Sequence, residues 1–106
     1  MSEERPSELK VLRDQLRELD DMEMMLYGTI GRNIELLHKL IDESKRLEEI
    51  KGTEITSDRL KDAREFLHSS IYELSYNVAE NIHRVVILHE LRRKIIEKYV
   101  EQLAIQ

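Results

Sequence analysis

Three of the four histidines in the chain lie three residues after a glutamate, a spacing that can hold a metal ion. On an α-helix, residues three apart lie on one face, and di-metal helical bundles place a carboxylate and an imidazole in this way. The pairs are Glu35/His38, Glu65/His68 and Glu80/His83. By helical phase, Glu80 points nearly opposite the apolar side and Glu35 lies well off it, so only Glu65/His68 comes close to facing inward.

The fourth histidine, His89, has a candidate partner far away in the sequence. A helical hairpin with its turn near residue 54 pairs residue i with about 108 − i, which puts Glu23 within roughly one turn of His89. Glu23, Glu65, His68 and His89 are therefore candidate metal ligands or proton-transfer groups. The alternative is structural, because single polar residues on an inner face fix the register of packed helices. The polar residues expected on the inner face are Glu23, Asn33, Ser44, His68, Ser75 and His89.

The element that must position the histidines at 68 and 89 is a helix predicted over 57–105, a stretch without Gly or Pro. Its first residues favour a helix N-terminus, and the polar stretch 68–77 is where it could bend. Its apolar residues recur at the helical period and form one stripe. The stripe consists of Leu60, Ala63, Leu67, Ile71, Leu74, Val78, Ile82, Val85, Val86, Ile95, Tyr99 and Leu103.

A first helix is predicted over 7–51, after a charged leader at 1–6 that we expect to fray. Ser7 is the expected N-cap. Gly28 and Gly31 could kink or break this helix, but the apolar phase continues through both of them, which favours one helix. Its stripe has the alternating spacings of three and four that are typical of coiled coils and contains Leu12, Leu16, Leu19, Leu26, Ile30 and Leu37.

A turn at 52–56 joins the two helices, with Gly52 suited to a left-handed position after the first helix. The predicted fold is all-α: one domain over 1–106 that forms a long antiparallel helical hairpin. Each apolar stripe is wider than a contact between two helices needs. We therefore expect the hairpin to dimerise into a four-helix bundle.

The composition argues against several functions. The net charge is −5, which disfavours nucleic-acid binding through a basic face, and we interpret the run 92–94 as a solvated flank. The chain has no Cys and therefore neither disulfides nor thiolate chemistry, as in many intracellular proteins. The longest apolar run, 85–88, is far shorter than the ~20 residues of a membrane span. We expect a cytoplasmic protein that binds neither membranes nor nucleic acid.

The stretch 12–20, with the pattern Leu-Arg-x-x-Leu-x-x-Leu-Asp, resembles the start of the all-helical chorismate mutases. Those enzymes are dimers built on a long first helix, and further cationic residues of that helix enter the active site. At the matching positions this chain has Ile30 and Ile41, and its Arg32 and Lys39 point outward by phase. The resemblance therefore does not include the cationic groups that would bind a dicarboxylate.

The stretch 89–92, His-Glu-Leu-Arg, resembles the phosphoacceptor box of sensor histidine kinases, whose dimerisation domain is also a helical hairpin dimer. Arg93 and Lys94 follow where that family has Thr-Pro. The histidine also lies on the second helix rather than the first. By phase it falls at the centre of the apolar face, where a phosphoacceptor could not be reached.

The functional prediction is a non-enzymatic oligomerisation and protein-interaction module: a scaffold, subunit or regulator. Its expected partner is a second copy of itself, in a homodimer or higher oligomer, with another protein as a further partner. It requires no cofactor. The alternatives are a metal-binding bundle, ferritin-like or of another kind, that uses Glu23, Glu65, His68 and His89, and a helical enzyme similar to the chorismate mutases.

Overall fold

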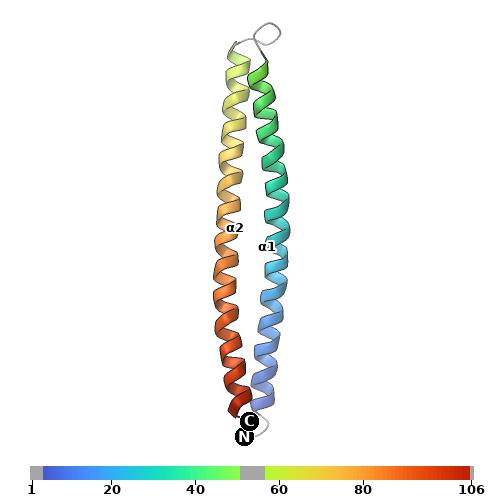
Figure 1. The fold of residues 1–106 in the computed structure, drawn as a ribbon, viewed down its shortest axis with the longest axis vertical. Helices are drawn as coiled ribbons and strands as arrows, with labels where there is room; N and C mark the ends of the chain where they lie inside the picture. Colours follow the sequence, from blue (N-terminus) through green and yellow to red (C-terminus); the bar gives the residue numbers. More distant parts are fainter. Residues whose placement is uncertain (1–3, 51–56, 106) are drawn as a thin grey trace. The chain divides into compact units, whose positions relative to one another are not determined.

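The computed structural model describes residues 4–50 and 57–105. In these ranges it contains two α-helices, α1 (Glu4–Glu49) and α2 (Ser57–Ile105), and no β-strand. Figure 1 shows that the chain runs through α1 and α2 in opposite directions. The prediction of an all-α helical hairpin is therefore confirmed.

α1 begins at Glu4, earlier than the predicted start at Ser7. Pro6 therefore falls in the first helical turn. A backbone N–H in that turn has no partner within the helix, so the missing N–H of a proline costs nothing there. Of the predicted leader, residues 1–3 lie outside the described residues.

α1 ends at Glu49, and the backbone N–H of Ile50 then donates to the carbonyl oxygen of Leu47 at 3.3 Å. A bond that spans three residues tightens the last turn and satisfies one of the carbonyls that a helix end leaves free. Residues 51–56, with the predicted turn, lie outside the described residues. α2 begins at Ser57 and continues as one helix through 68–77, the stretch where it could bend.

Gly28 and Gly31 lie inside α1, which continues through both. The sequence left open whether these glycines permit another helix to approach closely. A Cβ atom built at Gly31 would meet nothing within 4 Å. Within one chain, therefore, Gly31 carries the low helix propensity of glycine without a close contact that requires it.

Gly31→Ala is expected to stabilise the chain by about 0.8–1 kcal/mol, the difference in helix propensity between the two residues. Urea unfolding followed by circular dichroism measures this change. Ala79→Gly, at an exposed position inside α2, is the matched control and should lower the stability by a similar amount. A destabilised Gly31→Ala variant would show that another chain packs against this glycine.

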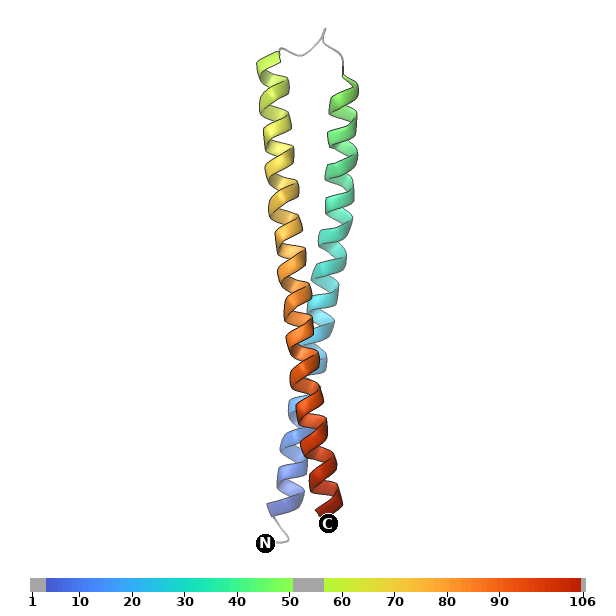
Figure 2. The same cartoon turned by 60° about the vertical axis from the view of Figure 1, so that its left-hand side comes forward.

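The chain forms two compact units, each of which combines a segment of α1 with a segment of α2. Unit 1 contains the described residues 4–28 and 82–105, and unit 2 contains 29–50 and 57–81. In Figure 2, the segments of unit 1 are coloured blue to cyan and orange to red, and those of unit 2 cyan to green and yellow to orange.

The buried and half-buried residues form the packed face of each helix, which we call the inner seam. On α1 they recur at alternating spacings of three and four residues, the pattern of a coiled coil. On α1 the inner seam contains Leu9, Leu12, Leu16, Leu19, Glu23 and Leu26 in unit 1, and Ile30, Asn33, Leu37, Leu40, Ser44 and Leu47 in unit 2. On α2 it contains Val85, Leu88, Arg92, Ile95, Tyr99 and Gln102 in unit 1, and Leu60, Ala63, Leu67, Ser70, Ile71, Leu74, Val78 and Asn81 in unit 2.

On α2, the packed face differs from the stripe that the sequence predicts. Ile82 and Val86 belong to that stripe, but their exposed fractions are 48% and 58%. Asn81 and Leu88 are buried instead. In the C-terminal half of α2, the packed face is therefore rotated by about one residue from its predicted position.

The predicted and observed faces of α2 separate after Val78. The predicted stripe takes a step of four residues from Val78 to Ile82, whereas the inner seam takes a step of three to Asn81 and then alternates steps of four and three to Gln102. Asn81 is polar, so a stripe traced through apolar residues at the helical period continues at Ile82 instead.

Candidate functional site

The main polar site of unit 1 lies within its inner seam, where Glu23 of α1 and Arg92 of α2 interrupt an otherwise largely apolar contact. The exposed fraction of the Glu23 side chain is 9%, and that of Arg92 is 24%. Arg92 is thus part of the packed face and not the solvated flank that the sequence predicts. A carboxylate this deeply buried is rare unless it is paired.

Arg92 contacts two carboxylates of α1. One is Glu23, whose Oε1 lies 2.9 Å from Nη1 of Arg92 and 2.9 Å from Nε2 of His89. The other is the exposed carboxylate of Asp20, whose Oδ1 accepts a hydrogen bond from Nη2 of Arg92 at 2.5 Å. The hydroxyl of Tyr27 lies 3.3 Å from the same His89 nitrogen. The five residues form one charged layer that joins α1 to α2 inside unit 1.

The charges in this layer are close, but its hydrogen bonds are incomplete. Oε1 of Glu23 has no well-aligned hydrogen-bond donor despite the two contacts at 2.9 Å, and Nε of Arg92 is buried without a partner. The short distances from Glu23 to Arg92 and His89 allow strong Coulombic attraction. Because the hydrogen-bond angles are poor, part of the cost of removing Glu23 and Arg92 from water is not compensated. Such a layer is a poor source of net stability and a good means of fixing the register of two helices.

The four candidate metal ligands are only partly brought together. Glu23 and His89 are in contact, as the hairpin pairing predicts, but Glu65 and His68 belong to unit 2 and are exposed. Among the described residues, no group of three or more His, Cys, Asp or Glu side chains is arranged to hold a metal ion.

Three polar residues that the sequence places on the inner face lie outside it. His68, Ser75 and His89 are exposed, and 53% of the His89 side chain is accessible. Within one chain, His89 therefore lies beside the face of α2 that packs against α1 and not at its centre. Asn33 and Ser44, on α1, are half-buried on the inner seam.

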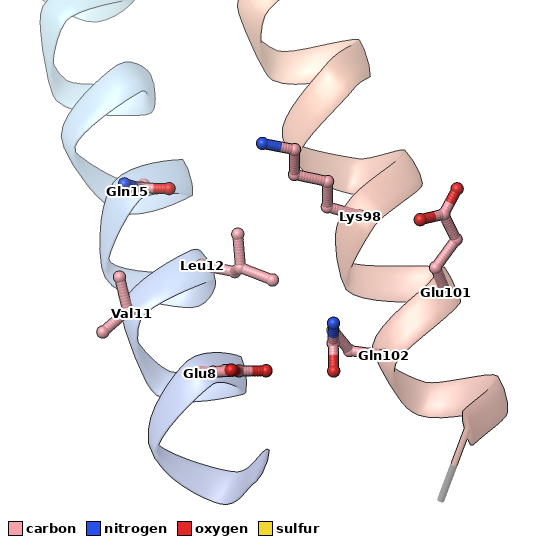
Figure 3. A pocket seen from close by; sticks show the side chains of 7 residues that line it. All are labelled: Glu8, Val11, Leu12, Gln15, Lys98, Glu101 and Gln102. Atoms are coloured by element: carbon pink, nitrogen blue, oxygen red, sulfur yellow. The ribbon is translucent and has the colours of Figure 1, made fainter. Parts of the chain in front are cut away.

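The surface hollows of unit 1 are open and do not resemble an active site. Figure 3 shows one of them, of about 670 Å³, with Leu12 of α1 and Gln102 of α2 reaching toward the facing helix. Its charged groups, from Glu8, Lys98 and Glu101, have mixed signs and do not converge on one point. Arg32 and Lys39 are the cationic residues of α1 that lie near, but not at, the positions of the chorismate mutase pattern. Both are exposed, and both belong to unit 2.

A smaller hollow of unit 1, of about 330 Å³, has an apolar lining. Met22, Met25 and Ile87 contribute to it, and each of these side chains is also exposed. Methionine adapts its shape to different partners, so an exposed group of this kind suits a contact with apolar side chains. Unit 2 has a comparable open hollow that includes the exposed Phe66.

The most regular feature of the surface is a second heptad stripe on α2, which we call the outer seam. Its seven residues follow one another at spacings of four and three, next to the inner seam on the helix surface. Five of the seven are apolar, and all seven are exposed. The outer seam consists of Ile82, Val86, His89, Arg93, Ile96, Val100 and Leu103.

Arg93, at the middle of the outer seam, is held by two carboxylates of its own helix. Its Nη2 lies 2.6 Å from Oε1 of Glu90, and its Nη1 lies 2.8 Å from Oε1 of Glu97. The hydrogen bond and charge of Arg93 lower the pKa of Glu90. The same contacts, with Glu90 contributing most, raise the pKa of Arg93. The positive charge of Arg93, the one arginine of the outer seam, is therefore offset by two carboxylates of the same helix.

Comparisons of this chain with protein-family models, curated proteins and solved structures found no match. Within the described parts of α1 and α2, no stretch is long and apolar enough to cross a membrane.

Proposed function

We propose that this chain is a non-enzymatic helical interaction module that assembles with a second copy of itself, as a scaffold, subunit or regulator. The observation that carries the proposal is the amount of apolar surface left open. Among the described residues, no side chain is completely shielded from solvent, and the buried hydrophobic residues are few. They are Leu9, Leu19, Val85 and Leu88.

The total accessible surface supports the same proposal. The chain exposes 8548 Å². A folded monomer of 12.7 kDa is expected to expose about 6,200 Å², so the surplus is about 2,300 Å². A stable protein interface covers about 600–1,000 Å² on each partner. The surplus is more than one such interface would cover.

The arrangement of the open apolar residues favours helices as the partner surface. The five apolar residues of the outer seam follow heptad spacings on α2, and a heptad stripe packs best against another helix of similar spacing. A second hairpin supplies such helices and closes a four-helix bundle. The charged side chains form ion pairs within one helix, as around Arg93, or between α1 and α2, as around Arg92.

The proposal predicts a dimer in solution. Sedimentation equilibrium at micromolar concentration should give twice the chain mass of 12.7 kDa, and dilution should shift the mass toward the monomer together with a loss of helical circular dichroism. A monomer that stays fully helical across the same range of concentrations would overturn the proposal. A stable mass larger than that of a dimer would show that the chain forms a higher oligomer.

A further inference from the structure

We propose that the outer seam of α2 is the surface on which a second copy docks, with the two α2 helices antiparallel. This inference rests on the proposed self-association and adds to it the contact surface and the orientation. The outer seam runs from Ile82 to Leu103, about 32 Å along the helix axis. That length gives three heptads, enough for a continuous helix–helix contact.

The outer seam is complementary to itself when one copy is reversed. In an antiparallel pair centred near Arg93, Ile82 of one chain faces Leu103 of the other, and Val86 faces Val100. In an antiparallel pair, the numbers of two facing residues have a constant sum. Here the two sums are 185 and 186, so both pairs can form in one register. A surface that matches its own reversed copy is what a two-fold dimer requires.

The polar residues of the seam also favour the antiparallel arrangement. A parallel pair would place His89 against His89 and Arg93 against Arg93, giving two polar layers in succession. The antiparallel pair places His89 against the apolar Ile96 and leaves only Arg93 on the two-fold axis. Antiparallel helix dipoles attract, whereas parallel ones repel.

The arginine on the two-fold axis does not oppose this pairing, because it brings its own counter-charges. Each Arg93 lies 2.6 Å from Glu90 and 2.8 Å from Glu97. Two such groups facing one another carry four carboxylates for two guanidinium groups. The positive charge of each arginine is therefore offset by carboxylates where the two chains meet, and each arginine can reach a carboxylate of the other chain. His89 is likewise engaged by its own chain through Glu23 and Tyr27.

Cysteine cross-linking tests the surface and the orientation together. The chain has no native Cys, so single cysteines report cleanly. When Ile82→Cys and Leu103→Cys chains are mixed, a disulfide or a short thiol cross-linker should join one chain of each kind. Neither variant should join to itself, because identical positions then lie about 32 Å apart. Efficient self-linking of each variant alone would overturn the antiparallel orientation.

A charge substitution provides an independent test of the surface. Val86→Glu should weaken self-association about 100-fold or more, since it removes apolar contact from both copies. Val11→Glu is the matched control, because Val11 is a similarly exposed valine of unit 1 that lies outside the outer seam. Sedimentation of both variants measures the two dissociation constants, and circular dichroism checks their folding.

The outcomes separate this inference from the proposed function. A dimer that forms normally in Val86→Glu and cross-links through other positions would overturn the outer seam as the interface while leaving self-association intact. A helical monomer in the unsubstituted chain would overturn both. If Val86→Glu does not fold, the cross-linking of the cysteine pair decides alone.

Discussion

Val85→Asp is expected to abolish the folded hairpin that residues 4–28 and 82–105 form. Val85 is one of the few buried hydrophobic residues of the chain, with 7% of its surface exposed, and it lies on the inner seam of α2. A carboxylate at this position would be buried among apolar side chains without a cation. Leaving a charge buried and uncompensated costs about 3–5 kcal/mol.

That cost is large compared with the stability of small proteins, which is about 5–15 kcal/mol in total. The chain also has few other buried side chains that could offset the loss. The measurement is the helical circular dichroism signal and its urea midpoint at a fixed protein concentration. Val85→Asp should lower the midpoint strongly or leave no cooperative transition.

The control for this substitution is His83→Asp, which adds a carboxylate at an exposed position of α2 two residues away. Surface substitutions usually change stability by no more than about 0.5 kcal/mol, so its midpoint should stay near that of the parent. A Val85→Asp chain as stable as His83→Asp would contradict the assignment of the inner seam.

The phase of α1 can be predicted from the sequence because its apolar residues follow one uninterrupted heptad pattern. The leucines at 9, 12, 16 and 19 set a phase that continues across the glycines, and the packed face follows it to Leu47. Helix continuity through Gly28 and Gly31 follows from the same regularity, since a loop would have no reason to preserve it. Local pattern and tertiary packing agree along this helix.

The phase of α2 is harder to predict because two apolar heptad stripes lie next to one another. Val85 belongs to the inner seam and Val86 to the outer seam, although the two residues have the same side chain. Periodicity shows that both positions lie on the apolar side of the helix. Which of them faces α1 depends on how the two helices meet, and Asn81, the buried residue where the packed face leaves the predicted stripe, is polar.

The polar layer was predictable in part. The antiparallel pairing of a hairpin brings Glu23 close to His89, because it requires only the position of the turn. Arg92 was missed because it begins a run of three basic residues, which usually marks a solvated surface. Its long apolar stem allows it to lie on the packed face while its guanidinium reaches Glu23 and Asp20.

Arg92→Leu is expected to destabilise the chain by about 3–5 kcal/mol, because it leaves the carboxylate of Glu23 buried beside a half-exposed histidine as its only remaining basic contact. Glu23→Leu should cost less, since Arg92 keeps Asp20 as a partner and is itself partly exposed. Urea unfolding of the two variants measures the difference. Asp20→Asn, which changes an exposed partner, is the control and should have a small effect.

The double variant Glu23→Leu/Arg92→Leu should recover the stability of the parent or exceed it by about 1–4 kcal/mol, because an apolar pair removes the desolvation cost that the incomplete hydrogen bonds leave. Its register should become less uniform, since a heptad contact without a polar layer can slip by one heptad. Amide NMR spectra measure this directly: the parent should give one set of signals and the double variant several. A double variant that is both more stable and uniform would show that the layer does not fix the register. A double variant as unstable as Arg92→Leu would show that the layer contributes net stability despite its incomplete hydrogen bonds.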